Sequence, residues 1–159
     1  MTFPARQRRL LRDEDGDLAV LEGRTIAVLG YGLLGRPLAL NLRETGAGTV
    51  IVGSDDQPSS AQAVADGFVV ESLAEATAAA DVALLLVPDE AQPEVMERIA
   101  PRLRPGSTLL FASGYALAYD LVSPPPGVNI VLFAPRMSGD PIRARFLAGQ
   151  GFLSYVGVE

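Results

Sequence analysis

The sequence predicts an α/β fold: a single doubly wound domain with a mostly parallel sheet. Short runs of β-branched and other apolar residues alternate with helical stretches along the chain. This alternation is typical of a parallel sheet covered by helices on both faces. The glycine-rich turn Gly30-Tyr31-Gly32-Leu33-Leu34-Gly35 directly follows the first apolar run and opens a helix. A turn of this composition between a strand and a helix predicts a Rossmann dinucleotide-binding fold.

The first half of the chain contains three predicted strands. Residues 25–29 read as a fully buried strand because the run is apolar on both faces. Residues 34–44 read as an amphipathic helix, since Leu34, Leu38 and Leu42 share one face. The next elements expected are a strand at 49–52, a helix at 60–66 and a strand at 68–70.

The second half continues the same alternation. Ser72-Leu-Ala-Glu75 predicts a capping box that begins a helix, and the apolar run 81–87 predicts a central strand. Ser123–Gly127 predicts a stiff surface turn. The remaining elements expected are a helix at about 91–100, strands at 108–111 and 129–133, and a helix followed by a strand within 141–158.

The chain stops at Glu159 shortly after a predicted strand, so we expect one Rossmann domain over residues 18–159 and no second domain. Residues 1–17 form an N-terminal arm that we expect to pack on the surface or to pair with a partner subunit. The arm carries arginines and then an acidic run, without the apolar region of a signal peptide. No apolar run approaches the roughly 20 residues of a membrane span, and we expect a cytoplasmic protein.

Composition excludes several classes of function. The 159 residues carry a net charge of −6, which argues against nucleic-acid binding. Cysteine and histidine are absent, so thiol chemistry is excluded, the commonest general base is missing, and we expect no metal site. All 13 basic residues are arginine, which excludes a lysine Schiff base. Asp, Glu and Tyr remain for acid–base chemistry, with Ser or Arg in support.

Each glycine of the turn has an expected role in cofactor binding. Gly30 permits the tight turn, Gly32 lets the backbone approach a pyrophosphate, and Gly35 lets helix and strand pack closely. Backbone N–H groups at the helix start then meet the phosphates at the positive end of the helix dipole. The whole turn, including Tyr31, Leu33 and Leu34, is therefore assigned to the cofactor; a ligand-free glycine turn is the alternative.

The loop after the second predicted strand bears on the choice of cofactor. Asp55 lies 20 residues after Gly35, with Asp56 beside it, and a carboxylate there accepts the adenine-ribose hydroxyls of NAD. No arginine occurs between Arg43 and Arg98 to receive the 2′-phosphate of NADP. NAD(H) is therefore favoured, while NADP(H) stays possible because nearby hydroxyl groups could bind a phosphate: those of Ser54, Ser59 and Ser60.

Several stretches together resemble the N-terminal domain of ketol-acid reductoisomerase, and the resemblance covers Asp13 to Glu159. The stretches lie in the family's order and spacing: Asp17 to Gly32, Val87-Pro-Asp-Glu-Ala-Gln92, Leu109 to Tyr115, Ala134-Pro-Arg136 and Arg143 to Gly151. The resemblance implies a nicotinamide-cofactor domain of an oxidoreductase.

The chain also departs from this family. Ser113-Gly114-Tyr115 stands where the family has His-Gly-Phe, and Pro135–Gly139 replaces Pro-Lys-Gly-Pro-Gly. The family's NADP-binding loop commonly holds an arginine near Asp55, and the loop is one residue shorter here. The family's C-terminal helical domain, which supplies carboxylates for two magnesium ions, has no counterpart in these residues. We therefore expect this chain alone to lack the isomerisation, which needs a Lewis acid.

Ligand-facing side chains are expected at the ends of the later strands. Val87, Pro88 and Asp89 are assigned to the cofactor, although Asp89 could instead cap the next helix. Glu90 could face the substrate or could simply favour the helix start by its charge.

The candidate catalytic residues are Tyr115, Ser113, Arg136 and Glu90. Tyr115, or a water held by Ser113, could deliver a proton, although Tyr115 could equally be a packing aromatic. Arg136 could hold a substrate carboxylate or form a surface salt bridge. Ser113 and Gly114 are also assigned to the cofactor.

The leading hypothesis is an NAD(P)H-dependent oxidoreductase of ketol-acid reductoisomerase type without the isomerase half, which reduces a small carbonyl or imine acid. A homodimer or a helical partner protein would close the site, because a bare Rossmann edge leaves the nicotinamide open to water. Two alternatives stay open: a non-catalytic dinucleotide-binding, sensing or scaffold protein, and an N-terminal fragment of a longer enzyme.

Overall fold

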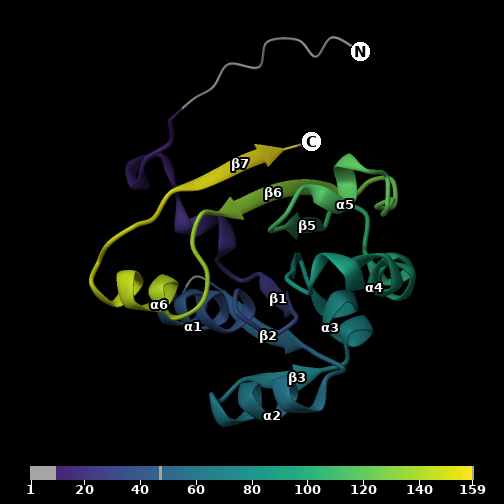
Figure 1. Cartoon of the computed structure of the whole chain (residues 1–159), viewed down its shortest axis with the longest axis horizontal. Coiled ribbons are helices and arrows are strands. Elements are labelled where there is room, and N and C mark those ends of the chain that lie inside the picture. Colours follow the sequence, from purple (N-terminus) through teal and green to yellow (C-terminus); the bar gives the residue numbers. More distant parts are fainter. Residues whose placement is uncertain (1–9, 47, 159) are drawn as a thin grey trace.

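The computed structural model describes residues 10–46 and 48–158, with Asp13 as backbone only. Its seven-stranded sheet has the order β3-β2-β1-β4-β5-β6-β7 (Figure 1). All strand pairs are parallel except β6 with β7. This arrangement confirms the predicted doubly wound α/β fold. The strands are β1 (Thr25–Leu29), β2 (Thr49–Gly53), β3 (Val69–Glu71), β4 (Val82–Leu85), β5 (Thr108–Phe111), β6 (Asn129–Pro135) and β7 (Ser154–Val158).

The described part of the chain also contains six α-helices and four short 3-10 turns. The helices are α1 (Gly35–Thr45), α2 (Gln57–Ala65), α3 (Leu73–Ala79), α4 (Gln92–Ile99), α5 (Tyr115–Ala118) and α6 (Asp140–Leu147). The 3-10 turns are η1 (Asp13–Asp15), η2 (Leu18–Leu21), η3 (Asp89–Ala91) and η4 (Ala100–Arg102).

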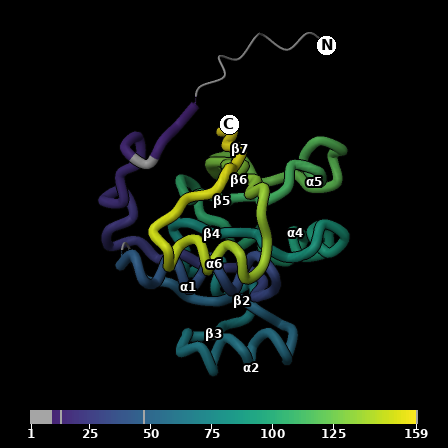
Figure 2. Tube along the Cα trace, turned by 60° about the vertical axis from the view of Figure 1, so that its left-hand side comes forward, coloured from purple at the N-terminus to yellow at the C-terminus, as the bar shows by residue number. Residues whose placement is uncertain are grey.

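Helices cover both faces of the sheet, because alternate residues of the central strands are buried on opposite sides. Ala27 and Leu29 of β1 belong to a core cluster shared with α3, α4 and α5. Ile26 and Val28 belong to a second cluster shared with α1 and α2. α6 packs on α1, and α4 and α1 lie on opposite sides of the sheet (Figure 2). Each fully buried Leu or Ile stabilises the fold by roughly 1.5–3 kcal/mol.

Most predicted elements are present, with shifted ends. The strands at 25–29 and 108–111 match β1 and β5, and the capping box at Ser72 is formed. α2 begins three residues earlier than the expected residue 60, because Asp56 accepts a hydrogen bond from the Ser59 N–H at 2.9 Å and caps it. The strand expected at 81–87 is shorter: β4 ends at Leu85.

Asp81 lies just before β4 and joins it to β1 and to the segment before β5. Its carboxylate accepts hydrogen bonds from the Thr25 N–H (2.9 Å) and from Arg104 (3.0 Å). The hydrogen bond from the Thr25 backbone is the main reason that the pKa of Asp81 is lowered. The backbone of Asp81 is also paired, because its N–H donates to the Thr25 carbonyl and its carbonyl accepts from the Thr108 N–H, each at 2.9 Å.

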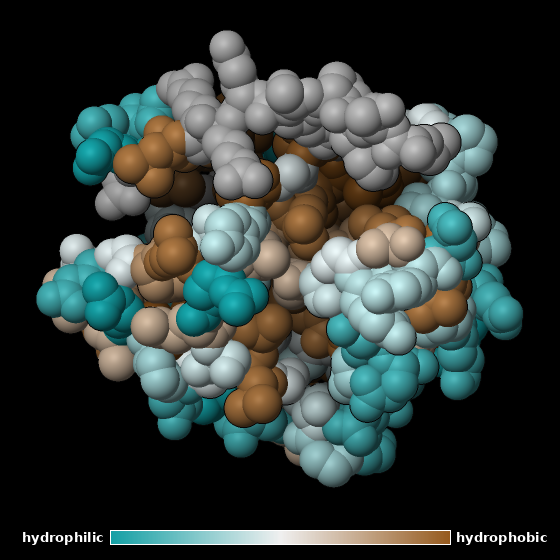
Figure 3. All heavy atoms as spheres, turned by 45° about the horizontal axis from the view of Figure 1, so that its top comes forward, coloured by the Kyte–Doolittle hydropathy of each residue, from teal (hydrophilic) through white to brown (hydrophobic). Residues whose placement is uncertain are grey.

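The β6–β7 end of the sheet exposes apolar side chains. Tyr155, Val156 and Val158 of β7 are each more than half exposed, and Figure 3, which looks onto this end, shows apolar residues gathered there. No helix within residues 10–46 and 48–158 has the length and apolarity needed to cross a membrane. Residues 1–9 of the predicted N-terminal arm lie outside the described residues.

Candidate functional site

A cavity of about 960 Å³ opens at the C-terminal ends of the central strands. It is lined by the turn after β1, the loop after β2, the segment after β4, the segment after β5, and Ser138 after β6. The connections from β1 and β4 lead to opposite sides at this point, since β2 lies on one side of this pair and β5 on the other. Ligands of open α/β sheets bind at such a switch point.

Gly30 and Gly32 of the turn are glycines for different reasons. Gly30 has φ +98°, and a Cβ there would lie 3.0 Å from the Val87 nitrogen, so the fold itself requires a glycine. Gly32 is outside the left-handed region, and a Cβ there would meet no described atom within 4 Å beyond its chain neighbours. The space above Gly32 belongs to the cavity, so a ligand that approaches the backbone explains this glycine better than packing does.

The N-terminus of α1 faces the same space. The helix begins at Gly35, and its N-cap is Leu34, whose apolar side chain cannot cap the helix. Gly32, Leu33 and Leu34 all line the cavity. A helix start without a side-chain cap presents backbone N–H groups and a partial positive charge, which suits a phosphate.

Tyr31 borders the cavity, and it belongs to the core cluster that contains Ile26 and Val28. The side chain is 4% exposed, and its hydroxyl donates to Asp66 at 2.9 Å. Burial, followed by this hydrogen bond, raises the pKa of Tyr31. The Tyr31 hydroxyl is thus engaged by Asp66, and the cofactor role assigned to this residue stays a prediction.

Asp66 also accepts two hydrogen bonds from Arg36, at 2.7 and 3.1 Å, which lower the pKa of Asp66 to about 2. Because an unfolded aspartate titrates near ~3.9, this contact stabilises the fold above about pH 4 and is lost as the pH falls toward 2. We expect Asp66→Asn to lower the free energy of unfolding by about 1–3 kcal/mol at neutral pH, and by less in acid. Urea denaturation of both proteins at neutral and acidic pH measures this difference.

Asp120→Asn serves as the control for that experiment, because it removes a carboxylate from the exposed residues after α5. Its stability should stay within about 0.5 kcal/mol of the wild type. A loss for Asp66→Asn that is equal at every pH would contradict the assignment of the effect to the ionised carboxylate.

The loop after β2 brings its acidic residues to one end of the cavity. Ser54, Asp55, Asp56 and Ser59 line it. The Asp55 carboxylate accepts from the Leu73 N–H at 3.3 Å and, through its other oxygen, from the Arg98 guanidinium. The expectation that no arginine is available to this loop is therefore wrong, because α4 brings Arg98 to it from 43 residues away.

The hydroxyls of this loop have separate roles. Ser60 does not line the cavity; its hydroxyl donates to the Asp56 carbonyl at 2.9 Å. The hydrogen bonds from Ser59 that hold the α2 cap also lower the pKa of Asp56. Ser54 and Ser59 are thus the two serines of the loop that border the cavity.

A hydrogen-bonded network spans the opposite end, beyond β4 and β5. The Ser113 hydroxyl donates to one oxygen of Asp89 (3.0 Å) and accepts from the Tyr115 N–H (3.2 Å). The other Asp89 oxygen accepts from Gln92 Nε2 at 3.0 Å. Asp89 therefore does not cap α4, whose N-cap is Ala91; instead its carboxylate joins the segments after the two strands.

Gln92 is the residue that the sequence analysis missed at this end. It lines the cavity and is 2% exposed, yet its Oε1 is buried without a hydrogen-bond partner in the described residues. A buried unsatisfied acceptor costs free energy unless a water or a ligand supplies a donor. Its place in Val87–Gln92, one of the stretches that resemble the family, was the only sequence signal for it.

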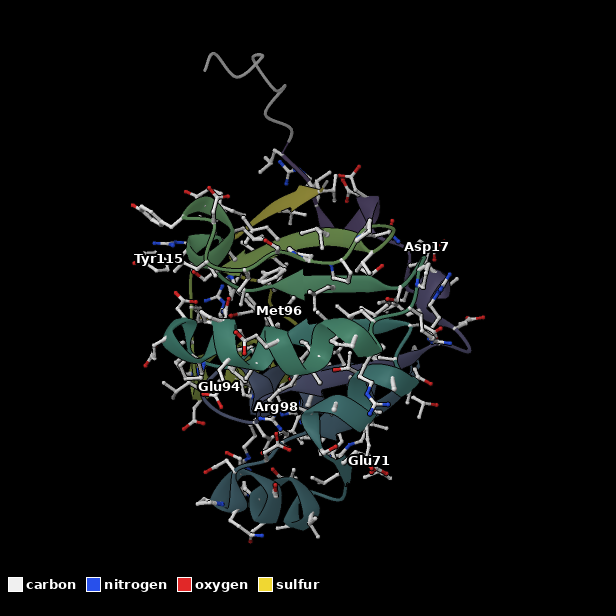
Figure 4. All side chains as sticks on the ribbon, turned by 90° about the vertical axis from the view of Figure 1, so that its right-hand side faces the viewer. Asp17, Glu71, Glu94, Met96, Arg98 and Tyr115 are labelled. Atoms are coloured by element: carbon white, nitrogen blue, oxygen red, sulfur yellow. The ribbon has the colours of Figure 1, made fainter. Side chains whose placement is uncertain are left out.

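Most residues assigned to the cofactor line this cavity; the exceptions are Gly35, Ser60 and Gly114. Of the candidate catalytic residues, only Ser113 does. Tyr115 is 51% exposed and packs on Tyr119 at 4.8 Å between ring centroids, and it projects outward from α5 (Figure 4). Glu90 is an exposed residue of η3.

Arg136 lies away from these residues, where β6 ends. Its guanidinium lies 5.8 Å from the centroid of the Tyr155 ring on β7, which is a cation–π contact rather than the salt bridge considered from the sequence. Leu73, Arg98 and Ser138 line the cavity without having been predicted, because each reaches it from an element that tertiary packing places there.

The family model and the curated relatives that match this chain point to one family. Residues 20–159 match the family model described as "Acetohydroxy acid isomeroreductase, NADPH-binding domain". The ketol-acid reductoisomerase (NADP(+)) of Pyrobaculum calidifontis is 44% identical over 151 residues, which cover 94% of this chain and 46% of that protein. The chain thus spans about half the length of the curated relatives that it matches.

Solved structures point to the same family. An NADH-preferring ketol-acid reductoisomerase from an uncultured archean superposes with a TM-score of 0.90 at 34% identity, covering 96% of this chain and 48% of that one. Mycobacterium tuberculosis 3-hydroxyisobutyrate dehydrogenase shares the fold alone, with a TM-score of 0.64 at 23% identity over 86% of this chain and 46% of that one.

Proposed function

The chain belongs to the ketol-acid reductoisomerase family, as its NAD(P)-binding domain, and we propose that it presents a reduced nicotinamide cofactor to a small carbonyl or imine acid for reduction. The open space above Gly32 carries this proposal. A dinucleotide pyrophosphate needs close backbone approach beside a helix N-terminus, and this turn offers both.

Different residues along the cavity bind different parts of the cofactor. The turn after β1 and the start of α1 hold the pyrophosphate, Asp55 accepts adenine-ribose hydroxyls, and Gln92 Oε1 accepts a donor from the nicotinamide half. Ser113 and Asp89 hold Gln92 in place through their hydrogen bonds. When bound, the reduced nicotinamide supplies the hydride.

We propose NAD(H) as the preferred cofactor, with NADP(H) accepted. Asp55 at the end of β2 supports NAD(H), and one structural neighbour is described as NADH-preferring. The curated relatives carry NADP(+) in their names, and Ser59 and Arg98 offer donors for a phosphate.

We also propose that a second polypeptide segment closes the site: another copy of the chain or a helical partner. Tyr115, Glu90 and Arg136 do not line the cavity, so the groups that complete catalysis would come from that segment. The same observation favours the second candidate function, a chain that binds the cofactor and catalyses nothing by itself. A cytoplasmic location stays part of this proposal.

Calorimetric titration of the chain with NADH and with NADPH tests the proposal. Saturable one-to-one binding of at least one cofactor is expected, and no heat of binding with either would overturn it. Turnover of a panel of keto acids by the intact oligomer then separates the two candidate functions, because only the oxidoreductase consumes the cofactor.

Gln92→Leu tests the nicotinamide end. Leucine is of similar size but has no acceptor, so we expect NADH to bind about tenfold more weakly, the typical effect of losing one well-placed hydrogen bond. ADP lacks the nicotinamide half, and its affinity should not change. Equal weakening of NADH and ADP would instead indicate that the substitution disturbs the whole cavity.

A further inference from the structure

Arg98 reaches the adenosine end of the cavity from α4, the helix whose first residue, Gln92, borders the other end. It lies in the last turn of α4, and in Figure 4 it lies below that helix, on the side toward α2. Its guanidinium pairs with the Asp55 carboxylate at the end of β2. Both side chains line the cavity.

We infer that Arg98 is a specificity-determining residue that lets this site accept the 2′-phosphate of NADP(H). This inference rests on the proposed function, since it concerns which cofactor enters the same cavity. The positive charge that would receive the 2′-phosphate then comes from α4 and not from the loop after β2.

The charges of Arg98 and Asp55 favour a site that accepts both cofactors. An isolated carboxylate where the adenine ribose binds accepts its hydroxyls and repels a 2′-phosphate. The guanidinium next to Asp55 cancels that charge, while Asp56 keeps its own carboxylate engaged in capping α2. The pair therefore presents one anion for ribose hydroxyls and one cation for a phosphate, within a single contact.

The Arg98 side chain is also free to move toward a phosphate. Asp55 does not depend on Arg98 for its position, because its other oxygen accepts from the Leu73 N–H at the start of α3. The Arg98 side chain is 46% exposed, and a guanidinium has five N–H donors, of which Asp55 engages Nη2. It can turn from Asp55 to a phosphate at little desolvation cost.

The Arg98–Asp55 pair is too exposed to have a purely structural role. A surface ion pair that is about half exposed contributes little to stability, so retention of the fold does not require Arg98. Its effect should appear in the ratio of the two cofactor affinities. A residue that merely positioned Asp55 would instead affect NADH, whose ribose hydroxyls the carboxylate receives.

The experiment compares Arg98→Gln with Arg102→Gln, which removes an exposed arginine of η4 that does not line the cavity. Dissociation constants for NADPH and NADH are measured by calorimetry at low ionic strength. We expect Arg98→Gln to weaken NADPH about tenfold or more, as for a lost charge-assisted hydrogen bond, and to change NADH less than about twofold. Arg102→Gln should leave the ratio unchanged.

Asp55→Asn should have the opposite effect. It should weaken the binding of NADH and shift the ratio of the two cofactor affinities toward NADPH. The inference is overturned if Arg98→Gln leaves the ratio unchanged or weakens NADH as much as NADPH while the wild type binds both. Failure of the wild-type chain to bind either cofactor would overturn the proposed function together with this inference. The two failures are therefore distinguishable.

Discussion

Gly32→Val is expected to abolish binding of both reduced cofactors while leaving the chain folded. A valine side chain would occupy the space where the pyrophosphate approaches the backbone, and it would separate the phosphates from the N–H groups at the start of α1. The fold should tolerate the change, because a Cβ at this position meets no described atom within 4 Å beyond its chain neighbours. We expect a loss of at least about 100-fold in affinity, more than a single lost hydrogen bond provides.

Calorimetry with NADH and NADPH measures this loss, and the urea midpoint shows whether the mutant is folded. Gly157→Val is the matched control: the same change in β7, where the nearest atom to a Cβ is Leu132 Cβ at 3.7 Å. It should bind both cofactors as the wild type does. Unchanged affinity in a folded Gly32→Val protein would place the cofactor elsewhere.

Local signals were sufficient for the elements that define this site. The run at 25–29 is apolar on both faces and forms a strand that is buried on both, and the glycine turn lies between it and α1. Ser72 and Glu75 satisfy each other's backbone N–H groups, which depends on residues three apart in sequence. Such features are encoded within one turn or one strand, so the sequence alone predicts them.

Contacts between distant segments were not predictable in the same way. The pairing of Arg98 with Asp55 joins residues 43 positions apart, and it exists because α4 packs beside α3. The inward orientation of Tyr31 likewise depends on a carboxylate 35 residues away. Neither residue carries a local pattern that differs from an ordinary exposed arginine or a turn aromatic.

Short helices and 3-10 turns were also hard to predict from the sequence. α5 has four residues, too few for a helical period to be visible in the sequence. Asp89 was a reasonable cap by type and position, yet the 3-10 turn η3 separates it from the first residue of α4. Its carboxylate instead receives hydrogen bonds from Ser113 and Gln92.

Gly35→Ala should fail in the opposite way from Gly32→Val, by loss of folding rather than loss of binding. A Cβ at Gly35 would lie 1.9 Å from the Gly30 carbonyl oxygen and 2.9 Å from its carbon. Gly30 is itself held in place, because its N–H donates to the Gly53 carbonyl at 2.9 Å. The overlap must therefore displace α1 from β1.

We expect Gly35→Ala to lower the free energy of unfolding by about 3 kcal/mol, at the upper end of overpacking in a well-packed interior. That is a large fraction of the roughly 5–15 kcal/mol that holds a typical domain folded. Urea denaturation compares it with Gly32→Ala, the same methyl group added three residues earlier, which should change stability by less than about 0.5 kcal/mol. If the two alanine variants unfold at the same midpoint, the close approach of α1 to the turn is not what requires a glycine at position 35.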